Sequence, residues 1–450
     1  MKAAWASRRH DAEILRLAVP ALGALAIDPL VSLVDTAFVG RLGAVALGAV
    51  ALGGVVFAVA FAVFNVLEYG VTPYVAHALG AGDRARAERM VSGALGVGVV
   101  VGLAVAVGLW FAAVPLLRVL GAGPELVGAA VAYLRIRALA LPAVLVAMAA
   151  HGAYRGFQDT RTPLVVTGVA NLVNVVLDPL LIFGAGWGVS GAAAASAIAQ
   201  GLAAAVFLVL VQARRGSGLG IRWRRPDPEA LGSLWGAGRA LVLRTAALLA
   251  VFTAAAAVAA RVSTTALAAH QVVVQLWLFL ALVLDALAIA AQALVARALG
   301  AGDPSEARAL ADRLVALGVT AGFVLAAGLG GVAPWIGGWF TDDRAVVAAI
   351  GAVYPFVVGM QPLNGAVFVW DGVAMGAEAF GYLAVTTAAS ALPALALLGL
   401  VIPMDLGLAG VWWAIVAMMA LRAIALASWR RRGLLAVPGD HDPGSRGVGG

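Results

Sequence analysis

Long apolar runs separated by short polar turns dominate the chain. Most runs hold about 20 residues or more, the length that a helix needs to cross the hydrocarbon core of a bilayer. The pattern therefore predicts an all-α polytopic membrane protein with twelve transmembrane helices. The predicted spans are 14–39, 46–77, 88–116, 126–150, 161–184, 188–212, 230–259, 265–297, 307–336, 346–371, 379–402 and 406–429.

The composition agrees with the pattern. Apolar types make up 63% of the 450 residues and charged types only 12%, against about 45–50% and about 25% in soluble domains. There is no cysteine, and the five histidines have no ligand spacing, so we expect neither a disulfide nor a metal centre. No convergent catalytic set is visible either. We therefore expect a protein that is not an enzyme and that needs no cofactor.

The positive charges lie in the turns between the runs. The N-terminus, the turns after even-numbered spans and the residues after the last span hold twenty Lys and Arg, whereas the opposite turns hold four. The positive-inside rule then places both termini in the cytoplasm. The basic residues form no patch with interleaved aromatic residues, so the net charge of +7 does not indicate nucleic acid as a partner.

An internal repeat divides the chain. The segment 78–83, ALGAGD, recurs as 298–303, and at the same offset of 220 residues Gly152 and Gly156 fall on Gly372 and Gly376. Each half holds six spans, so the two lobes are expected to be pseudo-symmetric about an axis along the membrane normal. Matched lobes of this kind are typical of secondary transporters. We expect Asp83 and Asp303 to cap helices rather than to take part in transport.

The expected domains follow from the repeat. Residues 1–212 form an N-lobe and residues 230–432 form a C-lobe. A basic segment, 213–229, is the linker between them. Residues 433–450, rich in Gly, Pro and Asp, form a disordered tail.

Acidic and amide side chains inside the spans are candidate functional residues, because charge within a bilayer is costly. Burial can raise the pKa of a carboxyl group toward neutrality, which suits a proton or sodium site. Helix capping and pairing with arginine are the alternative roles; we favour function most for Asp35 and Asp178. The candidates are Asp28, Asp35, Glu68, Asn171, Asn174, Asp178, Asp285 and Asp371.

Asn171, Asn174 and Asp178 follow the spacing i, i+3 and i+7, so they share one helical face. Prolines in the spans that carry Asp35 and Asp178 are expected to let these helices bend, since proline lacks the N–H of the helical ladder. These prolines are Pro20, Pro29 and Pro179.

Arg135 and Arg137 are two residues apart and cannot share a face, so at least one of them is expected to be structural.

The spans contain no phosphate-binding loop, which leaves an ion gradient as the energy source. We expect apolar, aromatic and polar side chains of the spans to form a cargo cavity. The candidates for its lining are Phe64, Asn65, Arg244, Gln271 and Gln275.

Several motifs together resemble the multidrug and toxic compound extrusion (MATE) family, and most of all its bacterial DinF-type branch. They cover nearly all twelve spans. They are SLVDTAFVG at 32–40, RGFQDTRTP at 155–163, NVVLDPL at 174–180, AAHQ at 268–271, QLW at 275–277 and WDG at 370–372, with the two GAGD turns.

The resemblance implies antiport of organic cations or other amphipathic compounds against protons or sodium, by a monomer in the plasma membrane of a bacterium. It also implies that Asp35, Asn174 and Asp178 are the ion-coupling cluster. Asp371 matches an acid that some relatives use for sodium, but span 230–259 lacks an acidic partner, which favours protons.

The alternative is a flippase for lipid-linked glycans from the same superfamily. Such a cavity would be strongly cationic, whereas the predicted spans hold more acids than arginines with access to a cavity.

Overall fold

The computed structural model describes residues 2–213, 224–225 and 228–431, without the side chains of 2–9 and 58–63. The predicted tail, 433–450, and most of the predicted linker lie outside the described residues. The described part of the chain is helical and contains no strand. Its long helices are α1 (Lys2–Gly40), α2 (Ala44–Gly80), α3 (Arg84–Val119), α4 (Pro124–Leu139), α5 (Leu141–Gly156), α6 (Arg161–Pro179), α7 (Gly188–Ala213), α8 (Pro228–Val262), α9 (Thr264–Gly300), α10 (Pro304–Ile336), α11 (Arg344–Gly376), α12 (Phe380–Val401) and α13 (Gly407–Arg431).

The helices account for every predicted span. Within the described residues, ten helices are long and apolar enough to cross a membrane, and the bent pair α4–α5 makes an eleventh. The predicted span 46–77 lies within α2. The all-α membrane fold predicted from the sequence is confirmed.

The fourth predicted span is not one straight helix. It consists of α4 and α5, which meet at Ala140 with a bend of 47°. Pro142 lies in the first turn of α5, where its missing N–H costs nothing, but its ring would clash with a carbonyl of a helix continued from α4. The break ends α4 two residues after Arg137.

The chain forms two compact units. Unit 1 holds residues 1–14, 77–82 and 243–450, and unit 2 holds residues 15–76 and 83–242. The units differ from the expected lobes in two ways. The helix α8 is divided between Val242 and Leu243, and two short segments of the N-terminal half, 1–14 and 77–82, belong to unit 1.

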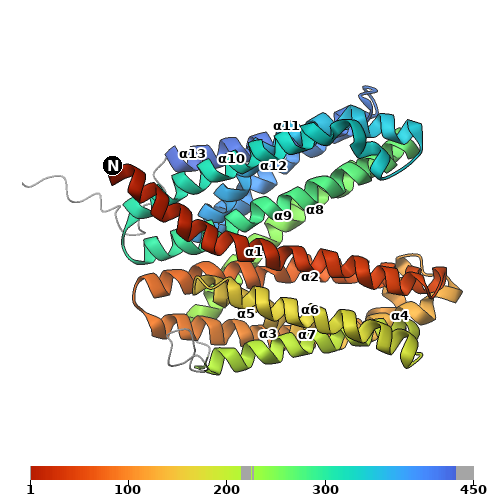
Figure 1. The fold of residues 1–450 in the computed structure, drawn as a ribbon, viewed down its shortest axis with the longest axis horizontal. Coiled ribbons are helices and arrows are strands. Elements are labelled where there is room, and N and C mark those ends of the chain that lie inside the picture. Colours follow the sequence, from red (N-terminus) through yellow and green to blue (C-terminus); the bar gives the residue numbers. More distant parts are fainter. Residues whose placement is uncertain (1, 214–223, 226–227, 432–450) are drawn as a thin grey trace, which may run out of the picture. The chain divides into compact units, whose positions relative to one another are not determined.

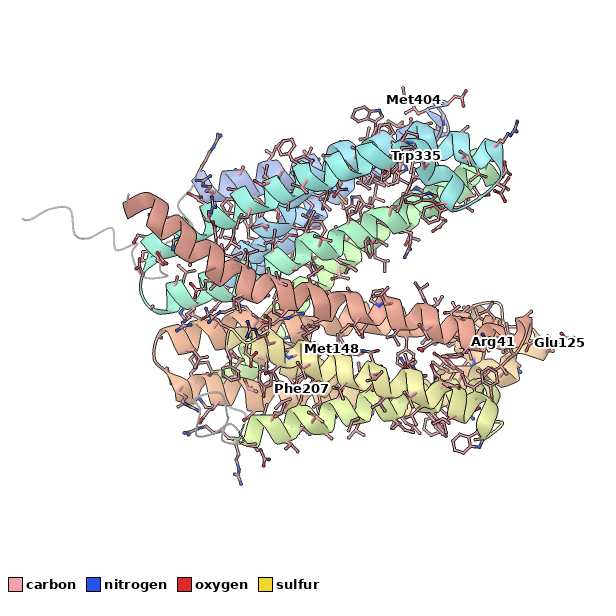
Figure 2. The ribbon with its side chains drawn as sticks, viewed as in Figure 1. Arg41, Glu125, Met148, Phe207, Trp335 and Met404 are labelled. Atoms are coloured by element: carbon pink, nitrogen blue, oxygen red, sulfur yellow. The ribbon has the colours of Figure 1, made fainter. Side chains whose placement is uncertain are left out.

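Each unit has its own packing pattern (Figure 1). In unit 2, α3 packs against α4 and α5, while α7 packs against α4, α5 and α6. In unit 1, α11 packs against α9, α10 and α13, and α12 packs against α13. Met148 and Phe207 lie inside unit 2, whereas Arg41 and Glu125 lie at one end of it (Figure 2).

The internal repeat is visible in two close contacts between helices. A Cβ atom at Gly152 would meet the carbonyl oxygen of Glu68, and one at Gly372 would meet that of Ala288. Both contacts differ by the same 220 residues. Small residues let helix backbones approach closely in membrane proteins, so the glycines fix the spacing of α2 and α5 and of α9 and α11.

The repeat extends to the backbone of the turns. Gly82 and Gly302 have φ angles of +74° and +72°, in the left-handed region that glycine adopts without strain. Gln158 and Glu378 also correspond at the offset of 220, and both have a φ of +58°. The sequence repeat is therefore a structural repeat.

Asp83 and Asp303 cap the helices that follow the two turns, as predicted. The carboxylate of Asp83 accepts a hydrogen bond from the backbone N–H of Arg86 at 2.9 Å, and that of Asp303 accepts one from Glu306 at 2.9 Å. The hydroxyl of Ser305 and this N–H hold the pKa of Asp303 below its ordinary 3.8. Its capping is therefore fully present above pH 3.8 and is lost as the pH falls through the lowered value.

The cap at Asp83 should contribute to stability and not to transport. We expect Asp83→Ala to lower the free energy of unfolding by about 1 kcal/mol, because the first turn of α3 loses an acceptor. Thermal unfolding in detergent measures the loss, and transport per folded molecule should stay at the wild-type level. Asp342→Ala is the matched control, since Asp342 is exposed and precedes the capping residue Asp343. A folded Asp83→Ala variant without transport would contradict this role.

Candidate ion-coupling site

Two carboxyl groups meet inside unit 2. Asp35 of α1 and Asp178 of α6 lie within hydrogen-bonding reach of each other, and we call them the acid pair. The side chain of Asp178 is 0% exposed, and neither of its oxygens has a donor among the described residues. A carboxylate is only an acceptor, so a hydrogen bond within the acid pair requires a proton on one member.

Asn174 connects the acid pair to α7. In the amide orientation that satisfies both of its ends, Nδ2 donates to Asp35 Oδ1 at 3.2 Å and Oδ1 accepts from the backbone N–H of Ser196 at 3.2 Å. The amide therefore presents an N–H group, and not an oxygen, to the acid pair. The predicted cluster of Asp35, Asn174 and Asp178 is assembled in the structure.

Prolines lie beside both acids. The helix α6 ends at Pro179, immediately after Asp178, and continues as a single π-helical turn, Leu180–Gly184. Such turns are frequent at functional sites, and the proline cannot donate to the helical ladder. In α1, Pro20 and Pro29 lie within one continuous helix.

Arg137 of α4 supplies the positive charge that acts on both members of the acid pair. Its Nη1 donates to Gln200 Oε1 of α7 at 2.9 Å, and its guanidinium group lies 4.6 Å from the ring centroid of Phe57. Its Nε is buried and has no partner among the described residues. Tyr133, one turn before it, also faces Arg137.

Arg135 has a different environment. Its Nε donates to the carbonyl oxygen of Trp110 at 3.1 Å, and its guanidinium group lies 5.2 Å from the Trp110 ring centroid. The prediction that at least one of the two arginines is structural is confirmed, since Arg135 ties α4 to α3.

Unit 1 contains a charge triad formed by Arg244, Asp371 and Arg422. Asp371 Oδ2 accepts from Nη2 of Arg244 at 2.6 Å and also from Nη2 of Arg422. Asp371 and Arg422 are buried at 3% and 4% exposure. Two arginines therefore share one carboxylate, and the triad carries a net positive charge.

Glu68 forms a second polar network in unit 2. Its Oε1 pairs with Arg155 Nη2 at 2.6 Å and lies 3.4 Å from His151 Nδ1, while His151 Nε2 lies 3.2 Å from Thr167 Oγ1. Glu68 is thus an ion-pair partner of arginine. This is the alternative role that the sequence left open for it.

Asp28 pairs with an amide instead of a charge. Asn171 Nδ2 donates to Asp28 Oδ1 at 2.9 Å and to the carbonyl oxygen of Thr167 at 3.0 Å. Asn171 therefore lies on the same face of α6 as Asn174 but has its own acidic partner on α1.

The remaining candidates lie on α2 and α9. Asp285 is half-buried on α9, and Gln271 and Gln275 are exposed one turn apart on the same helix. Phe64 packs against the apolar core of unit 2, and Asn65 is half-buried beside it.

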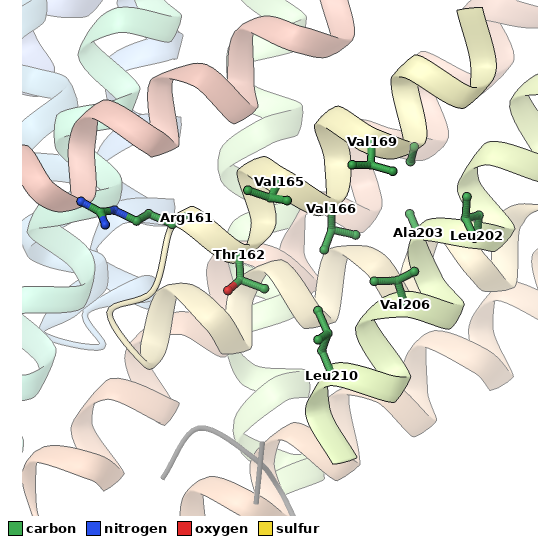
Figure 3. Close-up of a pocket in the computed structure, with 10 residues that line it drawn as sticks. Arg161, Thr162, Val165, Val166, Val169, Leu202, Ala203, Val206 and Leu210 are labelled. Atoms are coloured by element: carbon green, nitrogen blue, oxygen red, sulfur yellow. The ribbon is translucent and has the colours of Figure 1, made fainter. Parts of the chain in front are cut away.

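A groove of about 420 Å³ between α6 and α7 is lined by apolar side chains, with Arg161 and Thr162 at one end (Figure 3). None of the candidate residues lines it.

The acid pair has no counterpart in the second repeat. At the offset of 220 residues, Asp35, Asn174 and Asp178 correspond to Ala255, Ala394 and Leu398, which are apolar. The second repeat instead places Asp371 where the first has His151. The acid pair and the buried acid Asp371 thus occupy different positions of the repeat.

Sequence reasoning missed three residues of these clusters: Arg422, His151 and Arg155. Arg422 lies inside the span 406–429, so the cost of charge within a bilayer was the signal that could have identified it. His151 corresponds to Asp371 in the repeat, which was a second available signal.

Known proteins share this architecture. The MatE family model matches residues 20–180 and 240–400, which are more than half of the chain. The chain belongs to the MatE family. Members of this family are efflux transporters of drugs and toxic compounds and are not enzymes, which agrees with the absence of a catalytic set in the sequence.

Relatives and solved structures extend the match. The chain is 37% identical over 438 residues to Protein DETOXIFICATION 44, chloroplastic, from Arabidopsis thaliana, covering 93% of this chain and 81% of the relative. It is 30% identical over 449 residues to DNA damage-inducible protein F from Escherichia coli, covering 94% and 92%. The crystal structure of a MATE protein in the bent conformation aligns with a TM-score of 0.86 at 21% identity, covering 94% and 95%. That structural match shows a common fold.

Proposed function

We propose that this MatE family protein is an antiporter that exports organic cations and other amphipathic compounds in exchange for protons. The acid pair carries the coupling, and transport proceeds by alternating access between the lobes.

A single observation carries the proposal: a fully buried carboxyl group, Asp178, faces a second carboxyl group and has no donor within the described part of the chain. Two adjacent buried carboxylates repel each other and lose their hydration, so the pair gains stability by binding a proton or a cation. Proton binding and release then belong to the pair as a whole.

The same geometry supports protons over sodium. A hard cation takes oxygen ligands, but Asn174 directs its amide N–H toward Asp35, while its oxygen accepts from Ser196. The second acid considered for sodium, Asp371, is neutralised by two arginines. The flippase alternative needs cationic groups that can bind its cargo. The triad has a net positive charge, but both of its arginines contact the carboxylate of Asp371.

The proposed cycle follows from the charge of the acid pair. When it is ionised, its negative charge attracts a cationic cargo. Proton entry from the outside neutralises it, and α1 bends at Pro29 so that the cavity changes shape and cargo leaves. Since Asp178 is followed by Pro179 and a π-helical turn, α6 has a weak point of its own beside the acid pair.

We also propose that the protein lies in the plasma membrane of a bacterium with both termini in the cytoplasm. The support is the distribution of twenty against four basic residues between alternate turns. A reporter fused after residue 432 should be cytoplasmic, and a periplasmic reporter would reject the orientation.

Within the family, we propose a grouping with both the DinF-type bacterial proteins and the plant proteins, since the chain is 30% and 37% identical to one of each.

Transport by purified protein in liposomes tests the function. Efflux of ethidium, a monovalent organic cation, should follow an imposed pH gradient and should be unaffected by an imposed sodium gradient. Efflux driven by sodium alone would overturn proton coupling. Absence of efflux under both gradients, with protein shown to be folded, would reject ethidium-like cargo.

A further inference from the structure

We propose that Arg137 is a built-in counter-cation that sets the exchange at one proton per transport cycle. The inference rests on the proposed function and adds the number of protons, which the acid pair alone does not determine.

The charges near the acid pair are few. Asp28 and Asp35 come from α1, Tyr133 and Arg137 from α4, and Asp178 from α6; α7 contributes the neutral Gln200 and α2 contributes the ring of Phe57. Asp28 pairs with Asn171 and is not among the groups that act on the acid pair. The charges that act on one another at the acid pair are therefore those of Asp35, Asp178 and Arg137.

The sum of these charges fixes the number of protons. A guanidinium group stays protonated in proteins, so Arg137 is a permanent positive charge. With both acids ionised, the three groups carry a net charge of −1, and one proton makes them neutral. A monovalent cationic cargo beside the ionised pair also makes the sum zero. Because a net charge in a low-dielectric interior is costly, the site should alternate between one bound proton and one bound cation. Without Arg137, the acid pair would need two protons to become neutral.

Unsatisfied atoms indicate that Arg137 can change its partner. Arg137 Nε is a buried donor without an acceptor, and both oxygens of Asp178 are buried acceptors without a donor among the described residues. A buried polar atom without a partner is destabilising. Once the acid pair loses its proton, Arg137 Nε can donate to a carboxylate oxygen of Asp178, and both groups then have a partner. In the described conformation Gln200 holds the guanidinium group through Nη1 at 2.9 Å. Gln200 is thus a resting partner that does not neutralise the charge.

Gly53 positions the neighbouring side chain. A Cβ atom there would lie 2.5 Å from Cδ1 of Tyr133, so glycine leaves room for the ring beside Arg137. Tyr133 and Phe57 both lie against the guanidinium group of Arg137. Arg135 contacts Trp110 instead, and for this reason we assign Arg137, and not Arg135, to the site.

The equilibrium gradient of cargo measures the number of protons. In liposomes with the membrane potential clamped at zero and a pH gradient of about one unit, ethidium should reach a gradient of about tenfold for one proton and about 100-fold for two. We expect about tenfold for wild type, about 100-fold for Arg137→Gln, and about tenfold again for Arg137→Lys, which restores the charge. Arg135→Gln is the matched control on the same helix and should behave as wild type.

The outcomes separate the inference from the function on which it rests. Arg137→Gln at the wild-type gradient would overturn the inference while leaving proton antiport intact. A wild type that builds no ethidium gradient would reject the proposed function.

Infrared spectroscopy of the carboxylic acid C=O stretch decides the inference even if Arg137→Gln does not transport. At neutral pH the acid pair of the wild type should hold one proton and that of the variant two, with the bands assigned by their loss in Asp178→Asn. An equal number of protonated carboxyl groups in both proteins would overturn the proposal.

Discussion

Efflux driven by a pH gradient should fall to the level of protein-free liposomes when Asp35 is replaced by asparagine. An asparagine side chain is close in shape to a protonated aspartic acid but cannot release a proton, so the acid pair would lose its exchangeable group. Asp178→Asn should have nearly the same effect. Neither change should destabilise the protein, because each removes the repulsion between two adjacent carboxyl groups. Among the residues that the structure describes, no counter-ion is in direct contact with Asp178. Ethidium efflux and thermal unfolding in detergent measure the two effects.

Cargo binding separates coupling from folding in these variants. An Asp35→Asn protein that still binds ethidium in detergent, but no longer responds to the pH gradient, has lost only the coupling step. Asp28→Asn is the control on the same helix, since Asp28 pairs with Asn171 and not with the acid pair. If Asp35→Asn and Asp178→Asn both transport at wild-type rates, coupling lies elsewhere, and Asp285 and Asp371 become the candidates.

Loss of Asp371 should have the largest effect on stability. In Asp371→Ala, the guanidinium group of Arg422, which is buried with 4% exposure, would lose its carboxylate, and Arg244 would lose the same partner. Breaking a buried ion pair by removing one member costs about 3–5 kcal/mol, because an uncompensated charge stays buried. We expect a strongly lowered unfolding temperature and a lower yield of folded protein.

A compensating variant tests the reason for this effect. Asp371→Leu combined with Arg422→Met removes both the acid and its most buried partner, and should recover a large part of the lost stability. The milder Asp371→Asn should reduce transport per folded molecule less than Asp35→Asn does. A stable Asp371→Asn protein without any transport would show that coupling involves unit 1.

The clusters differ in how far the sequence could predict them. Asn171, Asn174 and Asp178 share a face by their spacing alone, and a carboxyl group in a long apolar run draws attention wherever it lies. Their partners could not be inferred in this way. Asp35 reaches Asp178 across 143 residues, and Asn171 and Asp28 are also 143 residues apart. No local periodicity relates such positions.

The roles of the arginines could also be assigned only from the tertiary structure. Arg135 and Arg137 are indistinguishable by type and separated by a single residue, yet one hydrogen-bonds to the Trp110 backbone and the other faces the acid pair. Arg244 seemed suited to a cavity, but it pairs with Asp371, and Arg422 joins them from α13. The bend at Ala140 decides where the end of α4 points, and it depends on the packing of Pro142 against Gly102.

The sequence by itself determined the membrane-spanning helices, the repeat and the type of residue at the coupling site. Each of these follows from short-range pattern: about 20 apolar residues span a bilayer, and an offset of 220 residues repeats the same turns and glycines. Only the tertiary structure decided which acids face each other, which are neutralised by arginine and which cation remains beside the acid pair. Those relations depend on distances between helices that are far apart in the chain, and charge interactions depend on distance and burial rather than on sequence order.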